Sequence, residues 1–282
     1  MSGRPPIITL TTDFGLQDPY VAAMKGAILT INPAVRLVDV SHTIRPQAIE
    51  QAAFVLAAAW PYFPPDTIHV AVVDPAVGSE RRALAVHAAD ATFVGPDNGV
   101  LSAALPDDAR AAANDSPAPV GLPEGYRAVS LANERFFRTP VSNTFHGRDI
   151  FGPVAAHLSL GVALEELGEP VEQITTLPPF RARRQPDGSL HGRVLHIDAF
   201  GNLITDVRLE DLPSRNAVIE VAGRVIHGVS ATYGPGTDVR AVTGSSGYLE
   251  IAAPGGSAAL VLKASLGEAV VVHFPPTEAT GR

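Results

Sequence analysis

The first part of the chain alternates short apolar runs with longer stretches in which apolar residues recur at helical spacing. Residues 7–10 (IITL) predict a buried strand, and residues 18–33 (DPYVAAMKGAILTINP) predict a helix with Pro19 near its start. A second strand is expected within 35–41, and an alanine-rich second helix within 47–64. This alternation predicts an α/β fold, with a mostly parallel sheet flanked by helices.

The alternation continues through three more predicted strands, within 67–74, 82–88 and 92–99. Residues 107–125 are rich in Ala, Pro, Asp and Gly, and this composition predicts an exposed excursion. A further loop and helix are expected within 144–161, where helical spacing resumes.

The pattern changes near residue 177. Beyond it, short runs of β-forming residues are separated by Gly and Pro turns, as in RVLHIDAFGNLITDV, AVIEVAGRVIHGV and ALVLKASLGEAVVVHF. These runs predict a smaller, antiparallel β-barrel or sandwich. We therefore predict an N-terminal α/β domain at 1–180 and a C-terminal β domain at 188–277.

Composition narrows the classes of function. The 282 residues carry a formal net charge of −8 and include no Cys, which excludes disulfides, thiolate nucleophiles and Cys-based metal sites. No nucleic-acid partner is expected, because phosphate contacts need clustered Lys and Arg, and the short RARR cluster at 181–184 is interpreted as a solvated linker. The sequence has neither an apolar run of membrane-spanning length nor a recognisable secretory signal, so we expect a cytoplasmic protein without membrane contact.

Three of the predicted strands end in an acidic residue, namely Asp13, Asp39 and Asp74. Ligands of open α/β sheets bind beyond the carboxyl ends of the strands, so these acids are candidates for a site. A single Asp at such a position more often caps a helix or turn. For Asp13 both interpretations stay open, because its carboxylate could also bind a vicinal diol such as a ribose.

Two arginines follow Asp74 closely along the chain. Arg81 and Arg82 are adjacent and would point to opposite faces of a strand, so the pattern does not decide which of them meets the carboxylate. Farther on, His146 precedes Gly147, a glycine that would allow a ligand to approach closely.

The second predicted domain offers two polar candidates. Asp198 follows a predicted strand, and Asn202 follows a Gly turn. The amide of an Asn can donate to and accept from a purine edge, although Asn after Gly is also ordinary turn chemistry.

Six stretches, in order over nearly the whole chain, resemble the S-adenosylmethionine hydroxide adenosyltransferase family, whose relatives include fluorinating and chlorinating enzymes. The stretches are TTDFGLQDPYVAAMKG, VVDPAVGSERRALAV, GPDNG, TFHGRDIFGP, DAFGNLITD and GSSGYLEIA. The resemblance implies displacement at the ribose C5′ of S-adenosyl-L-methionine by water or hydroxide, which gives adenosine and L-methionine without a metal or other cofactor. It also implies a homotrimer in which each site lies between the first domain of one subunit and the second domain of its neighbour.

Roles for residues of the first predicted domain follow from this resemblance. Asp13 would bind the ribose hydroxyls, while Asp74, Arg81 and His146 would form an Asp-Arg-His group that positions the water. The leaving sulfonium needs no general acid. The attacking water, however, is a weak nucleophile, because free water has a pKa of ~15.7 and is hardly deprotonated. An arginine that stays charged can orient a water and stabilise its hydroxide character as the proton leaves.

In the second predicted domain, the resemblance implies that Asp198 holds the methionine amine and Asn202 the adenine edge. Ser245 and Ser246 would lie near the methionine carboxylate, and Tyr233 would stack on adenine.

Departures from the halogenating relatives favour water over halide. Those relatives have Tyr where Asp74 stands, and Gln47 takes the place of a Trp in the fluorinating pocket. The long insertion of the fluorinating branch, between RRALAVHA and TFVGPDNG, is also missing here. Gly147 matches the chlorinating branch, whereas Asp74 and His146 match the hydrolytic one, and a fixed carboxylate would repel a halide.

Two other functions stay open on the residues alone. A metal-dependent hydrolase could use Asp13, Asp39, Asp74 and His146 as ligands, although no tight ligand spacing such as HxxxH supports it. A non-catalytic protein that binds adenosine or S-adenosyl-L-methionine could contain the same Asp-Arg-His group as an ion-paired wall.

Overall fold

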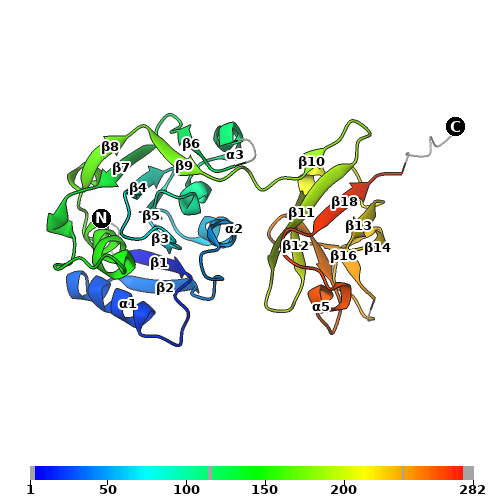
Figure 1. Cartoon of the computed structure of the whole chain (residues 1–282), viewed down its shortest axis with the longest axis horizontal. Helices are drawn as coiled ribbons and strands as arrows, with labels where there is room; N and C mark the ends of the chain where they lie inside the picture. Colours follow the sequence, from blue (N-terminus) through cyan, green and yellow to red (C-terminus); the bar gives the residue numbers. More distant parts are fainter. Residues whose placement is uncertain (1–3, 114–115, 237, 276–282) are drawn as a thin grey trace. The chain divides into compact units, whose positions relative to one another are not determined.

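The chain folds as two separate units, an N-terminal unit at Met1–Pro179 and a C-terminal unit at Phe180–Arg282. The computed structural model describes residues 4–113, 116–236 and 238–275 (Figure 1).

A seven-stranded sheet forms the centre of the N-terminal unit, in the order β2-β1-β3-β5-β4-β7-β8. Its strands are β1 (Ile7–Thr12), β2 (Arg36–Ser41), β3 (Ile68–Val72), β4 (Ala83–Ala88), β5 (Ala91–Pro96), β7 (Arg127–Leu131) and β8 (Gly168–Val171). The four strands β2, β1, β3 and β5 pair in parallel, whereas β4, β7 and β8 are joined by antiparallel pairings. Five of the seven strands consequently run in one direction, and the expected mostly parallel sheet is confirmed.

Helices cover both faces of this sheet, as the alternating pattern predicted (Figure 1). The helical segments are α1 (Tyr20–Ile31), α2 (Ile49–Ala59), η1 (Trp60–Tyr62), η2 (Val100–Ala104), η4 (Glu134–Phe136), η5 (Gly147–Phe151), α4 (Gly152–Ser159) and η6 (Leu164–Glu166). Val70 of β3 packs on the face covered by α1 and α4, and the next residue, Ala71, packs on the face covered by α2 and η2. In the described part of the chain, no helix combines the length and apolarity needed to cross a membrane.

The segment expected as an exposed excursion is partly buried, which corrects that prediction. It contains α3 (Asp107–Arg110), η3 (Ala111–Ala113) and β6 (Ala118–Gly121), and β6 pairs with β9 (Gln173–Thr176). Arg110 and Val120 are each 4% exposed. The Arg110 guanidinium donates to the carbonyls of Leu177 and Pro178, at 3.2 and 2.7 Å. A charged residue in a small-residue stretch can therefore be buried where backbone carbonyls satisfy it, which composition does not reveal.

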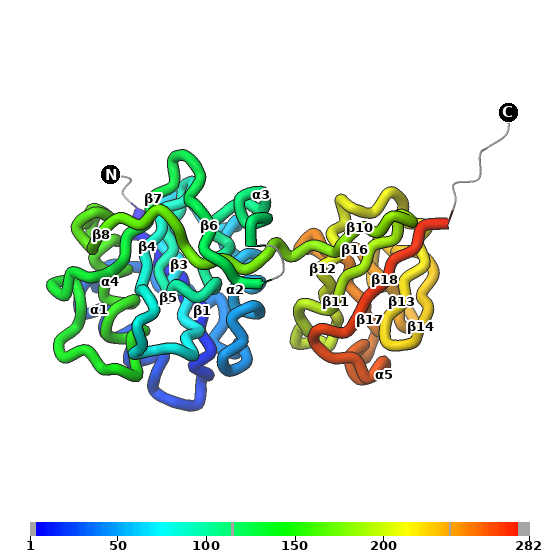
Figure 2. The backbone as a smooth tube through the Cα atoms, turned by 45° about the horizontal axis from the view of Figure 1, so that its top comes forward, coloured from blue at the N-terminus to red at the C-terminus, as the bar shows by residue number. Residues whose placement is uncertain are grey.

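The C-terminal unit is built on a nine-stranded sheet in the order β14-β13-β18-β11-β12-β17-β16-β15, with β10 paired to β11 (Figure 2). Its elements are β10 (Arg183–Arg184), β11 (Leu190–Ile197), β12 (Leu203–Arg208), η7 (Leu209–Asp211), β13 (Val218–Val221), β14 (Arg224–His227), β15 (Val229–Ser230), β16 (Arg240–Thr243), β17 (Tyr248–Ala252), α5 (Ala258–Leu262) and β18 (Ala269–His273). The pairings are antiparallel except for β15 with β16, and β14 also contacts β16. The sheet thus curls into a nearly closed barrel around an apolar core, which confirms the predicted β fold.

Candidate functional site

Asp74 and Arg81 lie in one connection, between β3 and β4, and meet His146 of a distant segment beyond the carboxyl end of β3. A tight turn after β3 leads from Asp74 back to Arg81, just before β4. At Gly78 in this turn, φ is +77°, and an added Cβ would lie 2.3 Å from the carbonyl oxygen of Asn143. The turn therefore packs against the segment that leads to His146, and this close approach needs a residue without a side chain.

The Arg81 guanidinium bridges the other two side chains. Its Nε donates to both oxygens of Asp74, at 3.1 and 2.9 Å, and its Nη2 donates to Oδ2 at 2.5 Å. The same Nη2 lies 2.6 Å from Nδ1 of His146. A guanidinium cannot accept a hydrogen bond, so Nδ1 must be the acceptor, and a neutral His146 ring then carries its proton on Nε2.

This group is largely shielded from solvent. The side chains of Arg81 and Asp74 are 10% and 4% exposed, and the guanidinium carbon lies 5.4 Å from the centroid of the Phe151 ring. Burial lowers the pKa of His146, and the charge of Arg81 lowers it further, against the opposing charges of Asp74 and Asp149. The imidazole is therefore neutral at neutral pH, as its acceptor role at Nδ1 requires.

Arg82 belongs to a different set of contacts. Its Nε donates to Asp97 at 2.8 Å, and its Nη2 donates to the carbonyl of Gln173 at 2.9 Å. Of the two adjacent arginines, Arg81 is thus the one that the fold brings to Asp74 and His146.

Asp13 lies directly after β1, at the same edge of the sheet as Asp74. Its Oδ2 accepts a hydrogen bond from the backbone N–H of Gln47 at 2.8 Å, where Gln47 has a φ of +65°. The next residue, Phe14, makes edge-to-face contacts with Tyr20 and Phe145. Asp13 therefore sits beside an aromatic cluster that reaches the residue preceding His146.

Asp39 is held by other side chains. Its Oδ2 accepts from Lys25 Nζ at 2.6 Å, and its Oδ1 lies 3.0 Å from Nε2 of His42. Within residues 4–113, 116–236 and 238–275, no group of three or more His, Asp or Glu residues could hold a metal ion. The four ligands considered for a metal-dependent hydrolase do not form one cluster in this region.

In the C-terminal unit, Asp198 and Asn202 share the turn between β11 and β12. Oδ1 of Asp198 accepts from the backbone N–H groups of Phe200 and Asn202, at 2.9 and 2.8 Å. Its Oδ2 accepts from the side-chain amide of Asn202 at 2.9 Å. The two predicted residues are thus brought into direct contact.

Tyr233 bonds to a residue that the sequence analysis missed. Its hydroxyl donates to Oε2 of Glu250 at 2.9 Å, and Glu250 is only 6% exposed. Ser245 and Ser246 lie in the hairpin turn between β16 and β17, the strand that carries Glu250. The available signal was an acid inside the otherwise apolar run at 248–252.

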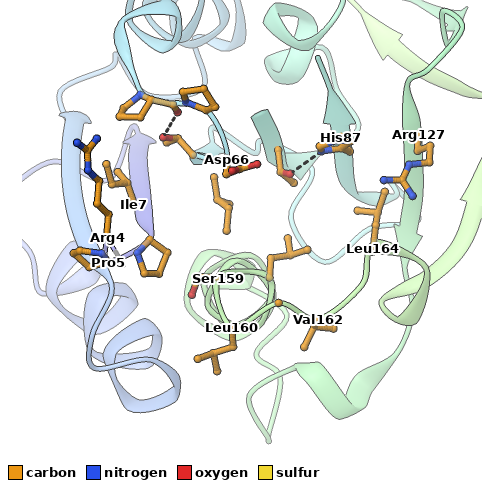
Figure 3. Close-up of a pocket in the computed structure, with 18 residues that line it drawn as sticks. Arg4, Pro5, Ile7, Asp66, His87, Arg127, Ser159, Leu160, Val162 and Leu164 are labelled. Atoms are coloured by element: carbon orange, nitrogen blue, oxygen red, sulfur yellow. Dashed lines mark hydrogen bonds between the residues drawn. The ribbon is translucent and has the colours of Figure 1, made fainter. Parts of the chain in front are cut away.

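A cavity of about 830 Å³ lies at the opposite end of the strands of the N-terminal sheet, where the parallel strands begin (Figure 3). It is lined by residues at the amino ends of the parallel strands, such as Ile7, Ile68 and Thr92, together with the end of α4. None of the predicted site residues lines it, so we do not assign the candidate chemistry to this cavity.

Known proteins are similar to this chain over most of its length. Two family models match, those of the SAM hydroxide adenosyltransferase N-terminal domain over residues 8–168 and C-terminal domain over residues 192–271. A Salinispora tropica protein named (R)-S-adenosyl-L-methionine hydrolase is 40% identical over an alignment of 272 residues, and the match covers 93% of this chain and 96% of that protein. A Nocardia brasiliensis fluorinase is 27% identical, over 75% of this chain and 74% of that protein. The crystal structure of an uncharacterized conserved protein from Thermotoga maritima, 30% identical, superposes with a TM-score of 0.81 and covers 95% of this chain and 100% of that one.

Proposed function

This chain belongs to the SAM hydroxide adenosyltransferase family, and on that premise we propose that it hydrolyses S-adenosyl-L-methionine to adenosine and L-methionine. The observation that carries the proposal is the Arg81 guanidinium, held between the Asp74 carboxylate and Nδ1 of His146. Higher identity to a protein named a hydrolase, 40%, than to one named a fluorinase, 27%, supports water as the nucleophile.

The reaction is a displacement at carbon. A water oxygen forms a bond to the ribose C5′, and the C5′–S bond breaks with its electron pair moving to sulfur. The sulfonium becomes the neutral thioether of methionine, so the leaving group needs no proton. The water loses its proton to solvent, and the protein's task is to stabilise the negative charge that develops on the attacking oxygen.

Arg81 and His146 are suited to this task. Because Nδ1 of His146 accepts from Arg81, the Nε2–H is the group that can donate to a water oxygen. Asp74 holds the guanidinium through both of its oxygens, which fixes the direction of the remaining donors. Donors that are already aligned in a shielded site favour hydroxide character without further rearrangement.

The substrate contacts that we propose involve both units. Asp13 binds the ribose hydroxyls. In the C-terminal unit, Asp198 binds the methionine ammonium, Asn202 and Tyr233 contact adenine, and Ser245 and Ser246 contact the methionine carboxylate. The direct bond between Asp198 and Asn202 supports a shared role in one ligand site.

We also propose a domain division, a location and an oligomeric state for this protein. The functional division is an α/β domain at 1–180 and a β domain at 188–277, and the protein acts in the cytoplasm as a homotrimer. Each site combines the first domain of one subunit with the second domain of its neighbour, and turnover needs neither a metal nor another cofactor.

The first test is to incubate chelator-treated protein with S-adenosyl-L-methionine and to follow adenosine and methionine by chromatography. Native protein should form both products, His146→Ala should form neither, and His191→Ala serves as the control with an exposed histidine replaced. Substrate that binds but stays intact would favour the non-catalytic binding protein. Activity that is lost with the chelator and restored by a divalent cation would favour the metal-dependent hydrolase. A 5′-halogenated nucleoside formed in the presence of chloride or fluoride would reveal halide use.

A further inference from the structure

We propose that Glu250 is a positioning residue, whose carboxylate holds the ring of Tyr233 in place for the nucleoside part of the ligand. This inference rests on the proposed function, in which Tyr233 contacts adenine. It assigns a role to a buried acid that neither the reaction nor the contacts proposed above use.

Glu250 is anchored in the middle of the C-terminal sheet. It lies in β17, where its register partners are Ile204 of β12 on one side and Val242 of β16 on the other. With strands on both sides, its backbone has little freedom, and the residue is 6% exposed. Glu250 therefore has a fixed backbone position from which its side chain can hold a partner in place.

Both carboxylate oxygens of Glu250 meet a neighbour. Oε2 accepts the hydroxyl of Tyr233 at 2.9 Å. Oε1 lies against Gly244, where an added Cβ would approach it to 2.2 Å. The carboxylate thus occupies space that only glycine leaves open, and this space directs it toward Tyr233.

Tyr233 lies between β15 and β16, next to Gly234 and close to Gly236. Arg240 Nη2 donates to the carbonyl of Pro235 at 2.9 Å, which holds the far side of this loop. The tyrosine is 48% exposed although its hydroxyl is bonded. A ring that is tethered at its tip and open elsewhere can present a face for stacking at a low entropic cost on binding.

Stability alone does not account for an acid at this position. Within the described residues, neither Glu250 nor Asp198 forms an ion pair with Lys or Arg. Burial raises the pKa of Glu250, and the nearby charge of Asp198 raises it as well, against the hydrogen bond from Tyr233. An apolar side chain would avoid the free-energy cost of burying this acid. We therefore infer that the carboxylate is present for its hydrogen bond with Tyr233.

The test distinguishes the effect of the hydrogen bond between Tyr233 and Glu250, here called the tether, from effects of the charge of Glu250 and of impaired folding. Tyr233→Phe removes only the hydroxyl, Glu250→Leu removes the acceptor, and Glu250→Gln keeps an acceptor of the same shape. Adenosine affinity is measured by calorimetry, KM and kcat by product formation from S-adenosyl-L-methionine, and folding by thermal melting.

We expect Tyr233→Phe and Glu250→Leu each to weaken adenosine binding and raise KM by about tenfold, with little change in kcat. The double variant should bind adenosine no more weakly than the single variant with the lower affinity, because both changes remove the same hydrogen bond. Glu250→Gln should bind nearly as the native protein does. Gly244→Ala, which crowds Oε1, should act in the same direction as Glu250→Leu.

Additive losses in the double variant, a Glu250→Gln variant as weak as Glu250→Leu, or native affinity in Glu250→Leu would each overturn the inference. Native protein that binds no adenosine would overturn it too. Native protein that binds adenosine but leaves S-adenosyl-L-methionine intact would instead refute the proposed function, while the adenosine data would still decide on the tether.

Discussion

The candidate residues of the two units balance their charges in different ways. In the N-terminal unit, the buried carboxylate of Asp74 is matched by Arg81, which also reaches His146. In the C-terminal unit, Asp198 is satisfied by backbone and amide N–H groups, and Glu250 by a tyrosine hydroxyl. Within the described residues, the first group contains its own cation, whereas Asp198 and Glu250 form no ion pair with Lys or Arg.

This difference suggests a division of work. A group that contains its own cation holds its geometry before any ligand arrives, as a reaction centre requires. Carboxylates that lack a cation are suited to a ligand with positive charge, and S-adenosyl-L-methionine carries an ammonium and a sulfonium. We therefore expect changes in the first group to act on turnover and changes in the second group to act on binding.

The largest effect is expected for Arg81→Lys. Lysine keeps the charge but cannot bond both oxygens of Asp74 and His146 at once, so kcat should fall by on the order of 10²–10³-fold with KM little changed. The matched control is Arg82→Lys, because the neighbouring arginine contacts Asp97 instead. Steady-state adenosine formation checks both variants. Equal losses in the two would show that the assignment to Arg81 is wrong.

A second prediction concerns acid stability, in which the two units should also differ. His69 is buried in the N-terminal unit, stacked on Phe93, with Thr9 Oγ1 2.8 Å from its Nδ1. Burial lowers the pKa of His69 to about 4, below an unfolded value near 6.5. Between these values, His69 binds a proton in the unfolded chain but stays neutral in the folded chain. Stability is therefore lost as the pH falls from 6.5 toward 4. The loss should reach about 3 kcal/mol of unfolding free energy.

The single tryptophan makes this measurable. Trp60 lies in the N-terminal unit, with its ring centroid 6.4 Å from that of His69, so its fluorescence in urea reports unfolding there. The double variant Thr9→Val with His69→Phe should flatten the pH dependence, because no buried imidazole remains to titrate. The control replaces the half-buried pair His87 and Thr92, whose Nδ1 and Oγ1 atoms are 3.3 Å apart. An unchanged pH slope in the first variant would refute the prediction.

In the C-terminal unit, Glu250 should act in the opposite direction. Its pKa is raised in the folded chain, so it binds a proton more readily there than in the unfolded chain. The stability that this provides is present at low pH and is lost as the pH rises through the raised pKa. Acid should therefore weaken the N-terminal unit through His69 while Glu250 partly protects the C-terminal unit.

The sequence predicted the fold class better than the details of the site. Alternation of strand and helix patterns predicted the parallel order of β1, β2 and β3, because crossover helices force it. The reversal of β4 between β5 and β7 was not visible, since antiparallel and parallel buried strands have similar apolar runs. On the residues alone, Arg81 could not be separated from Arg82, because which of two neighbours meets Asp74 depends on the turn geometry. Only the resemblance to the family favoured Arg81.

Glu250 shows a different limit of sequence reasoning. Its neighbours Leu249 and Ile251 fit a strand with one buried face, and strict alternation would place the acid between them on the opposite, solvent-facing side. Only the structure shows that Glu250 is buried and bonded to Tyr233, which lies 17 residues away in the sequence. Alternation along a strand thus does not reveal whether an acid is buried or what it contacts.

A third prediction tests the binding half of the comparison through Asp198→Asn. The amide preserves one acceptor for the turn but removes the negative charge, so KM for S-adenosyl-L-methionine should rise about tenfold or more while kcat changes little. Asp187→Asn is the matched control, because Asp187 also accepts bonds within a turn, from Ser189 at 3.0 and 2.7 Å. A fall in kcat with unchanged KM would place Asp198 with the reaction centre and remove the proposed division of work.

The smallest effect is expected for Ser257→Ala, which tests whether the Asp198 turn is held rigidly. Ser257 caps α5 by accepting from the N–H of Leu260 at 3.2 Å, and the N–H of Ala259 bonds to Gly201 within the turn. Losing the cap should cost about 1 kcal/mol of stability, seen as a lower melting temperature, with KM nearly unchanged. Ser214→Ala, at an exposed loop serine, is the control. If Ser257→Ala raised KM as much as Asp198→Asn does, the geometry of the turn that holds Asp198 and Asn202 would depend on α5. The binding residues of the C-terminal unit would then need a neighbouring element to hold them in place, whereas Asp74 is held by Arg81.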